Sequence, residues 1–445
     1  MIMKNKMIKY GVRYICILLA LACIATAFIS CAEQKKEVPD PIFVYGEYEM
    51  PLYFYEYMLS LKRGELASAK NDVESKRFWE TLTDKGISYE EYFNSEVLDS
   101  CRKYFVSACL FDERGYKLSS ATIAEIDESL EFLLDYDADG NVDDFNKMID
   151  DFGVTYEQLR ECYIILAKRD ALVAALYGNG GSLIADSLKN QYYKENYYRF
   201  KQILVRNYYY EYKTDDWGQE IYFDTETGKA LYDKENGEIH FDEDGAYIRD
   251  NGGKGEVIYF GDDGKPLYNK EKGQRAADLD ENGNPKKHEY TAEEMAERAA
   301  FAEKLAREIG DKNYTTFEAE LAAMQKKEDL GNSYPEGYYV SEIESANFGS
   351  YSYMNGILDT LKTMDEGEVK LHVSEFGYHV IMKYELDDGR FADGEYAEWF
   401  DLFITSLVSE MLNTELDKVM PQLLVNEENL AKARSIVNIG TNFDY

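Results

Sequence analysis

The chain has 445 residues, a hydrophobic content of 45% and a formal net charge of −36. A chain of this length is long enough for more than one hydrophobic core, so more than one domain is expected. The strong negative charge argues against nucleic acid or anionic lipid as a partner, because both would repel it.

Residues 1–30 are predicted to be a targeting segment outside the fold. Four basic residues precede an apolar, uncharged run from Tyr14 to Ser30, which is the pattern of a signal peptide. The run ends in a small residue followed by Cys31, and this junction resembles a bacterial lipobox, although Phe28 stands where leucine is usual. An uncleaved anchor helix is the alternative, since the run is near the lower length limit for a membrane span.

Lipidation of Cys31 would hold the chain on the extracytoplasmic face of the cell membrane through several acyl chains. Loss of the four basic residues before Cys31 would change the formal charge from −36 to −40. The remaining cysteines are Cys101, Cys109 and Cys162, an odd number. In a helix Cys101 and Cys109 would lie about 12 Å apart, too far for a disulfide, so all three are predicted to be buried thiols.

Residues 31–41 are predicted to be a polar tether, and residues 42–199 a helical domain. Apolar residues recur at three- and four-residue spacing over Tyr53–Leu61, Tyr89–Leu110 and Tyr156–Leu176, which predicts amphipathic helices. A last helix is expected over Asn190–Arg199.

Two local patterns in this region resemble the N-terminal chaperone domain of PrsA- and SurA-type foldases. The first is an opening strand, Val44-Tyr45-Gly46-Glu47. The second is a helix preceded by glycine, running from Gly153 through Thr155 and Glu157 to Leu159 and Arg160. The resemblance implies a domain that holds nonnative polypeptide.

Residues 208–288 form a polar, acidic segment rich in glycine turns, and it repeats internally. The ten residues Gly228–Gly237 recur as Gly264–Gly273, 36 positions later, and aromatic pairs recur at half that interval. Short aromatic strands that alternate with acidic glycine turns predict successive β-hairpins. The segment is predicted to be a small β-meander inserted in a surface loop, where closure entropy tolerates added length.

The residues around this insert, 200–388, predict a second domain. Strands are expected at Phe200–Val205, Gly337–Val340, Glu368–Leu371 and Tyr378–Glu385, and helices at Thr291–Gly310, Phe317–Met324 and Tyr353–Met364. Thr291 followed by Glu294 is a capping box. The order is β-α-α-β-α-β-β, so the whole chain is predicted to be α+β. Residues 389–445 are predicted to contribute one long helix, Ala397–Ala433.

The two ends of this second domain resemble a parvulin-type peptidyl-prolyl isomerase. Gly367-Glu368-Val369 with Phe376-Gly377-Tyr378-His379-Val380-Ile381 forms one end, and Gln202-Ile203-Leu204-Val205 forms the other. The resemblance implies the parvulin fold and a proline-binding groove. In the PrsA and SurA families the C-terminal segment returns to the chaperone domain, and the same is expected of 389–445.

The resemblance implies three catalytic positions. The second histidine of the parvulin pair falls on His379, the first falls on Gln202, and the acidic position falls on Asp329. Gln202 cannot titrate, although it can form hydrogen bonds. His379 is therefore either catalytic or a structural histidine of a strand, and Asp329 is either catalytic or a solvated turn residue.

The resemblance also implies an apolar proline seat near Tyr353, Ile357 and Met364, with Phe376 close to His379. An isomerase needs no nucleophile, because it has to stabilise a rotated amide more than a planar one. The barrier it lowers is about 20 kcal/mol. No cofactor motif accompanies these residues.

A calcium loop is a further candidate. Asp135, Asp137 and Asp139 with Gly140 match the first half of such a loop, but Asn146 stands where a bidentate glutamate is needed. An acidic turn between two helices is the alternative.

The sequence therefore predicts an extracytoplasmic lipoprotein foldase whose partners are nonnative secreted polypeptides. Peptidyl-prolyl isomerisation is either weak or lost because of Gln202. The alternative is a surface adhesion or envelope-assembly protein without enzymatic activity, which acts through the insert.

Overall fold

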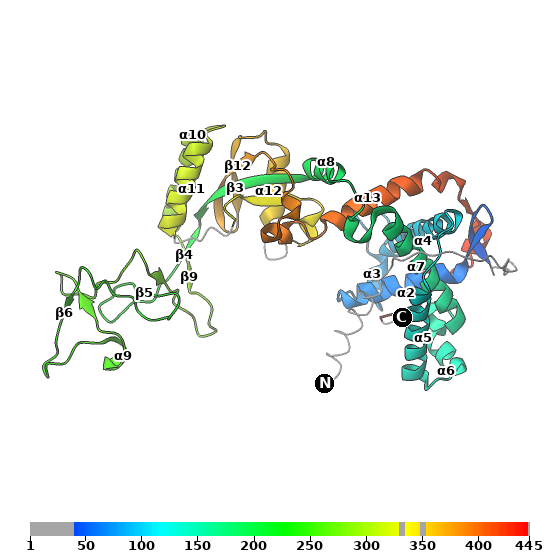
Figure 1. The fold of residues 1–445 in the computed structure, drawn as a ribbon, viewed down its shortest axis with the longest axis horizontal. Helices are drawn as coiled ribbons and strands as arrows, with labels where there is room; N and C mark the ends of the chain where they lie inside the picture. The colour runs from blue at the N-terminus through cyan, green and yellow to red at the C-terminus, as the bar shows by residue number, and fades with distance from the viewer. Residues whose placement is uncertain (1–39, 329–333, 348–352, 444–445) are drawn as a thin grey trace. The chain divides into compact units, whose positions relative to one another are not determined.

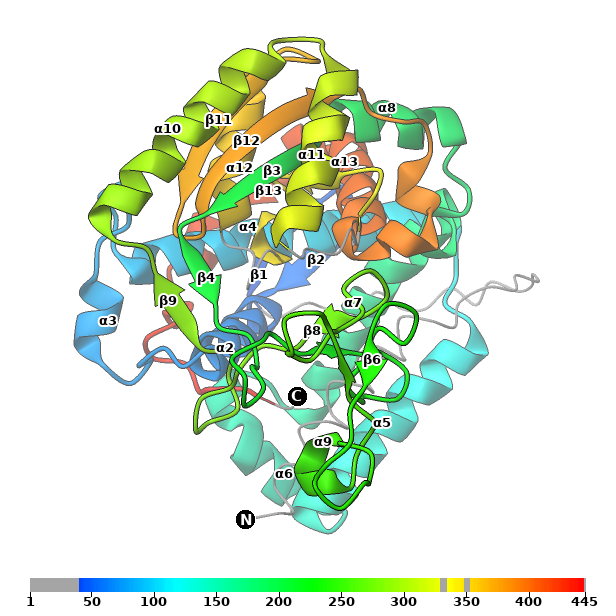
Figure 2. The same cartoon turned by 90° about the vertical axis from the view of Figure 1, so that its left-hand side faces the viewer.

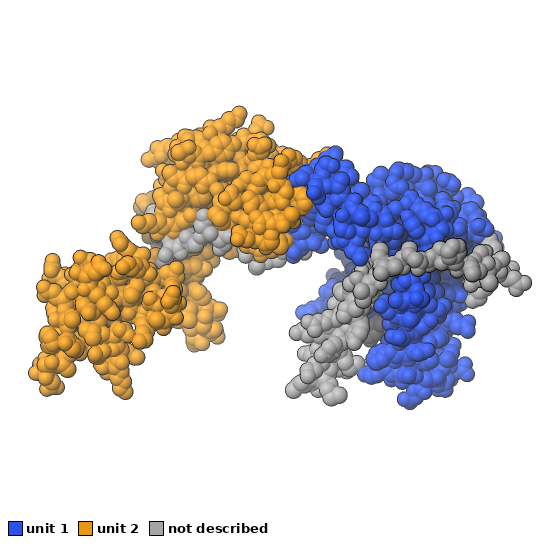
Figure 3. Space-filling view, viewed as in Figure 1, with its two compact units in different colours: residues 1–193, 400–445 blue, residues 194–399 orange. Residues whose placement is uncertain are grey.

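A computed structural model describes residues 40–328, 334–347 and 353–443. In this part of the chain 49% of the residues are helical and 18% are in strands, so the protein is of mixed α and β class, as predicted. The chain forms two compact units. Figure 3 colours them separately: unit 1 contains residues up to Tyr193 and Phe400–Tyr445, and unit 2 contains Lys194–Trp399.

Unit 1 is built from helices. They are α2 (Leu52–Ser68), α3 (Lys76–Glu80), α4 (Tyr89–Glu113), α5 (Ser120–Ala138), α6 (Val142–Ile149), α7 (Tyr156–Tyr177) and α8 (Asp186–Asn196). The apolar spacing predicted three of them, α2, α4 and α7. The start of α7 is fixed by a capping box between Thr155 and Gln158. α7 packs on α4 and α5, and α4 packs on α2. The last helix ends at Asn196, three residues before the predicted end.

The C-terminal segment returns to the start of the chain in unit 1. Strand β13 (Leu424–Val425) pairs antiparallel with β1 (Pro41–Tyr45), which also pairs with β2 (Tyr48–Pro51). Arg434 binds the carboxylate of Glu56 at 3.0 Å. Backbone pairing and a partly buried ion pair thus hold the C-terminal segment against residues 41–56.

The single helix predicted over Ala397–Ala433 is wrong. The structure has α13 (Phe403–Asp417), a turn at Met420–Gln422, β13 and the short α14 (Glu427–Leu430). Pro421 is the physical reason, because proline lacks an N–H and disfavours helical geometry in the preceding residue.

Unit 2 contains a four-stranded antiparallel sheet in the order β10-β3-β12-β11. The strands are β3 (Tyr197–Arg206), β10 (Tyr338–Ser341), β11 (Val369–Ser374) and β12 (Gly377–Tyr384), and the helices are α10 (Ala292–Ile309), α11 (Tyr314–Glu328) and α12 (Tyr353–Lys362). Figure 2 shows β11, β12 and β3 side by side. The observed element order is the predicted β-α-α-β-α-β-β, with the insert after β3.

The two faces of this sheet differ. One face carries the apolar core: Ile203 and Val205 of β3 and Val380 and Met382 of β12 pack against α10 and α11. Side chains alternate between faces along a strand, so Gln202 and His379 lie on the other face. Helix α12 contacts β10 and β11 of the sheet.

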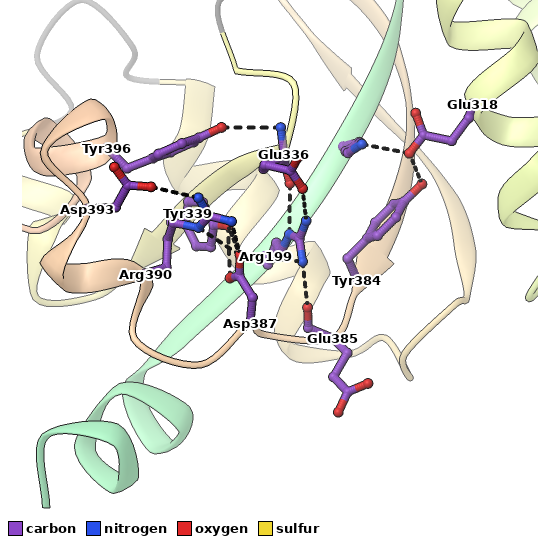
Figure 4. A network of polar contacts seen from close by, with 11 residues as sticks. Arg199, Glu318, Glu336, Tyr339, Tyr384, Glu385, Asp387, Arg390, Asp393 and Tyr396 are labelled. Atoms are coloured by element: carbon purple, nitrogen blue, oxygen red, sulfur yellow. Dashed lines mark hydrogen bonds and ion pairs between the residues drawn. The ribbon is translucent and has the colours of Figure 1, made fainter. Parts of the chain in front are cut away.

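A polar network closes the end of the sheet where β3 begins (Figure 4). Arg199 donates to the carbonyl oxygens of Glu336 and Glu385 at 2.7 and 3.2 Å. Tyr339 donates to Asp387 at 2.9 Å, and Arg390 pairs with the same carboxylate. The network joins the loop before β10 to the loop after β12 through the first residues of β3.

The insert contains short successive hairpins closed by isolated bridges, as predicted, but the meander prediction missed the pairing of its longer strands. The strands of the insert pair in a nested order, in which the first strand pairs with the last and the inner strands pair with each other. They pair as β4 (Tyr208–Tyr210) with β9 (Lys287–Glu289), β5 (Tyr222–Phe223) with β8 (Gln274–Arg275), and β6 (Glu238–Ile239) with β7 (Tyr259–Phe260). The acidic turns are closed locally by isolated bridges such as Phe241 with Tyr247. Figure 1 labels the insert around β5, β6 and α9 (Asp250–Gly253).

The two repeats of the insert pair with each other about a local two-fold relation. Tyr232 bridges its own counterpart, Tyr268, and the two rings stack with centroids 4.9 Å apart. Each hydroxyl donates to an aspartate at 3.0 Å: Tyr232 to Asp250, and Tyr268 to Asp215. The buried tyrosine pair is the centre of the small core of the insert.

Candidate functional site

The candidate site lies on the sheet face opposite the α10 and α11 core. Register places His379 of β12 opposite Leu204 of β3, and Gln202 lies two residues along β3, opposite Ile381. On the other side of β12, His379 is directly opposite His372 of β11. Three strands therefore bring polar side chains together on one face of the sheet.

Both ring nitrogens of His379 are engaged. The Nδ1 atom lies 2.6 Å from Oε1 of Gln202, and the Nε2 atom lies 2.6 Å from Oγ of Ser374. Since a carbonyl oxygen can only accept, Nδ1 carries the proton, and Nε2 of the neutral ring accepts from the Ser374 hydroxyl. Ser374 in turn accepts from the backbone N–H of Phe376 at 3.1 Å.

The result is a one-directional chain of hydrogen bonds that ends at Gln202. Its side-chain oxygen accepts from His379, and within the described ranges nothing accepts from its side-chain nitrogen. Gln202 thus contributes a neutral donor to the site and no titratable group.

Two aromatic side chains lie beside His379. The ring of Tyr353, at the start of α12, is stacked on the His379 imidazole with centroids 5.4 Å apart and 20° between the planes. The ring of Phe376 meets Tyr353 edge-on at 5.1 Å. Both aromatic residues are half-buried, whereas His379 is 1% exposed. A polypeptide could therefore contact the aromatic pair directly.

The site is uncharged at neutral pH. Burial and, to a smaller extent, the nearby His372 imidazole lower the pKa of His379 to about 4. Burial also lowers the pKa of His372. A neutral, partly apolar site of this kind can bind an amide and favour its less polar, rotated form.

The depressed pKa of His379 predicts a pH-dependent contribution to stability. In the unfolded chain a histidine is protonated below about pH 6.5, whereas in the folded chain His379 stays neutral down to about pH 4. The contribution is therefore complete above pH 6.5 and is lost as the pH falls toward 4, by up to about 3 kcal/mol. Urea unfolding from pH 4 to 7.5 should show this loss in the unmodified chain relative to His379→Gln, which has no titrating ring.

If the free energies of unfolding of His379→Gln and of the unmodified chain differed by the same amount at every pH in this range, the depressed pKa of His379 would be contradicted. The comparison removes the background titration of the many carboxylates, since both proteins share them.

The other predicted site residues are placed as follows. Ile357 and Met364 are 0% and 4% exposed, so both belong to the interior and neither is brought to the surface beside His379. Asp329 lies outside the described residues. Of the predicted residues, the structure brings His379, Gln202, Tyr353 and Phe376 together. Ile357 and Met364 belong to the interior, and Asp329 is not among the described residues.

Three further residues of the site, His372, Ser374 and Thr360, were not predicted from the sequence. The Nδ1 atom of His372 lies 3.2 Å from the Thr360 hydroxyl oxygen of α12. Its ring lies against Gly356, where a Cβ atom would come within 2.8 Å of Cε1. A signal for His372 was present: a two-residue turn between Ser374 and Gly377 fixes the hairpin register, and counting outward pairs His372 with His379.

The calcium-loop candidate is not a loop. Asp135 and Asp137 lie within α5, where residues two apart project in different directions, and Asp139 is the left-handed C-cap of that helix. The described residues contain no group of three or more His, Cys, Asp or Glu side chains that could hold a metal ion. The turn at residues 139–141 joins α5 to α6.

Cys101, Cys109 and Cys162 are free and buried, as predicted. Burial raises the pKa of all three thiols, which makes them unreactive. Cys31 lies outside the described residues. None of the helices in the described ranges combines the length and hydropathy needed to span a membrane.

Scans against models of known protein families and against curated protein sequences return no match.

Proposed function

We propose that this chain is an extracytoplasmic, lipid-anchored foldase similar to the PrsA- and SurA-type proteins. Unit 1 would hold nonnative segments of secreted proteins, and unit 2 would bind proline-containing segments and isomerise them slowly. Lipidation at Cys31 would supply the membrane attachment. The observation that carries the proposal is the neutral His379 network, flanked by Tyr353 and Phe376 on one face of a four-stranded sheet.

The chemistry of this site suits an X-Pro amide. Rotation about the C–N bond removes resonance, so the rotated amide is less polar than the planar form. An uncharged site with aromatic walls stabilises the rotated form relative to water. The free donor on Gln202 can hold the carbonyl oxygen during rotation. A slow rate is expected, because no second titratable group occupies position 202.

Exposed apolar side chains support the holding role of unit 1. Phe132 and Tyr136 of α5 stack on each other at 5.8 Å and are 65% and 61% exposed. Met148 of the neighbouring α6 is also exposed. Aromatic rings and methionine provide contact area that adapts to many sequences, which suits nonnative clients.

The net charge supports a protein whose polypeptide part does not bind the membrane surface. A mature charge of −40 would keep a chaperone soluble while it holds an apolar client, and it would be repelled by anionic headgroups. Attachment would then depend on the lipid alone.

A second candidate is a surface adhesion or envelope-assembly protein that acts through the insert. Exposed aromatic side chains in the insert favour it, namely Trp217, Phe241 and Tyr247. These side chains could contact a glycan or another surface protein by stacking.

Deletion of residues 208–288 separates the two candidates. Asn207 and Tyr290, which both remain, are joined by a backbone hydrogen bond of 3.4 Å, so a short glycine-serine link can close the gap. The foldase proposal predicts that the shortened chain still suppresses aggregation of an unfolded client, measured by light scattering, at close to the potency of the full chain. Loss of all client binding together with the insert would favour the adhesion candidate.

A further inference from the structure

His372 is the one histidine of this site with an unengaged ring nitrogen. The Thr360 hydroxyl donates to the Gly356 carbonyl oxygen at 3.0 Å, as helical threonines commonly do. Its oxygen therefore accepts from His372 Nδ1–H at 3.2 Å. This fixes the tautomer of the neutral ring and leaves a lone pair on Nε2, for which the described part of the chain offers no partner.

The position of the His372 ring is built by α12. Gly356 leaves space for the imidazole, because a Cβ atom there would lie 2.8 Å from Cε1 and 3.1 Å from Nε2. Glycine is less favourable than alanine inside a helix, so the space is kept at an energetic cost. Tyr353, Gly356 and Thr360 follow the helical repeat and present one side of α12 to the two histidines.

His379 cannot serve as an acceptor for a bound chain, because both its nitrogens are occupied and the residue is 1% exposed. His372 is half-buried, and its ring lies 5.9 Å from that of His379. The site thus offers a donor at Gln202 and an acceptor at His372, on either side of His379. An extended polypeptide presents the matching groups, a carbonyl oxygen and an N–H.

We propose that His372 is a binding residue of this site, whose Nε2 accepts a hydrogen bond from a backbone N–H next to the proline of a bound extended segment. This assignment rests on the proposed function, since it takes the ligand to be a proline-containing polypeptide. The assignment of His372 differs from what the parvulin resemblance implies, because that resemblance places the polar partner of His379 at position 202.

Two amide variants separate the two ring nitrogens of His372. His372→Asn places an amide near the Nδ1 position and can keep the bond to Thr360, but it has nothing at Nε2. His372→Gln extends an amide to the Nε2 position. Binding of a fluorescent proline-containing peptide to the full chain should weaken about tenfold in His372→Asn and less in His372→Gln. A merely structural role predicts the opposite order, because asparagine keeps the Thr360 contact.

Peptide N-methylation completes the test. The N–H groups that flank the proline are methylated one at a time, and one methylation should weaken binding to the unmodified chain but not to His372→Asn. Equal methylation effects in both proteins would overturn the assignment to His372. Failure of the unmodified chain to bind any proline-containing peptide would overturn the proposed function, and the assignment with it. Circular dichroism of each variant confirms that it is folded.

Discussion

Substitution of Gly377 by alanine is expected to destabilise unit 2 by at least about 3 kcal/mol. Gly377 begins β12 with φ +135°, a backbone geometry that side chains strongly disfavour. A Cβ atom there would lie 2.3 Å from the carbonyl oxygen of Val205 and 2.9 Å from Cα of Arg206. Relief requires β12 to move away from β3, which would break the His379–Gln202 contact. Guanidinium unfolding and peptide binding both report the change.

Gly389→Ala is the matched control for Gly377→Ala. Gly389 also has a positive φ, of +73°, but nothing lies within 4 Å of the Cβ position. Only the left-handed backbone penalty of about 1 kcal/mol is expected there. Equal losses of stability at both positions would show that contact with β3 does not set the requirement for glycine at 377.

Replacement of Arg63 by methionine is expected to destabilise unit 1 by about 3 kcal/mol. Arg63 is 7% exposed, and its guanidinium donates to the carbonyl oxygens of Val73, Val437 and Ile439. Methionine keeps an apolar stem at this position but leaves three acceptors, two buried and one partly buried, without this donor, at about 1 kcal/mol each. Hydrogen exchange should show early loss of protection in the C-terminal segment, and chemical denaturation gives the free energy.

Lys103→Met provides the comparison for Arg63→Met. Lys103 pairs with Asp99 on the surface of α4, with both side chains about half exposed. Exposed pairs of this spacing contribute about 0.5 kcal/mol or less. If Arg63→Met were as mild as Lys103→Met, the C-terminal segment would have to be held mainly by its other contacts, such as Arg434 with Glu56 and Ser435 with Glu90.

The sequence predicted local structure well where a local signal determines it. The capping box of Thr291 with Glu294 marks the start of α10, and the helical spacing between Tyr89 and Leu110 marks α4. In such segments the apolar period and the cap are both contained in the residues that form the element.

The sequence did not predict structure that depends on distant partners. Strand β13 exists because Val425 pairs with Phe43, at the other end of the chain. The repeats of the insert carry the same turn residues, so they predict the turns but not the partner of each strand. Pairing of Tyr232 with Tyr268 joins two copies of one motif, and no local pattern distinguishes that from pairing within a copy.

The candidate site was predicted in part for the same reason. His379 and Gln202 were identified by position in motifs, and their 2.6 Å contact follows from the β3–β12 register. Ile357 was assigned by analogy to an apolar seat, but its helical phase turns it into the core. His372 lies with Lys370 and Ser374 on the polar face of β11, and only the register of the β11–β12 hairpin shows that it lies opposite His379.

A protease-coupled proline-isomerisation assay tests the foldase account most directly. The account predicts that the full chain accelerates isomerisation of a proline-containing peptide slowly but measurably above the uncatalysed rate. His379→Ala should bring the rate back to that baseline while circular dichroism stays unchanged. Isomerisation at the uncatalysed rate in both proteins would contradict catalysis at His379 and leave unit 2 as a binding module.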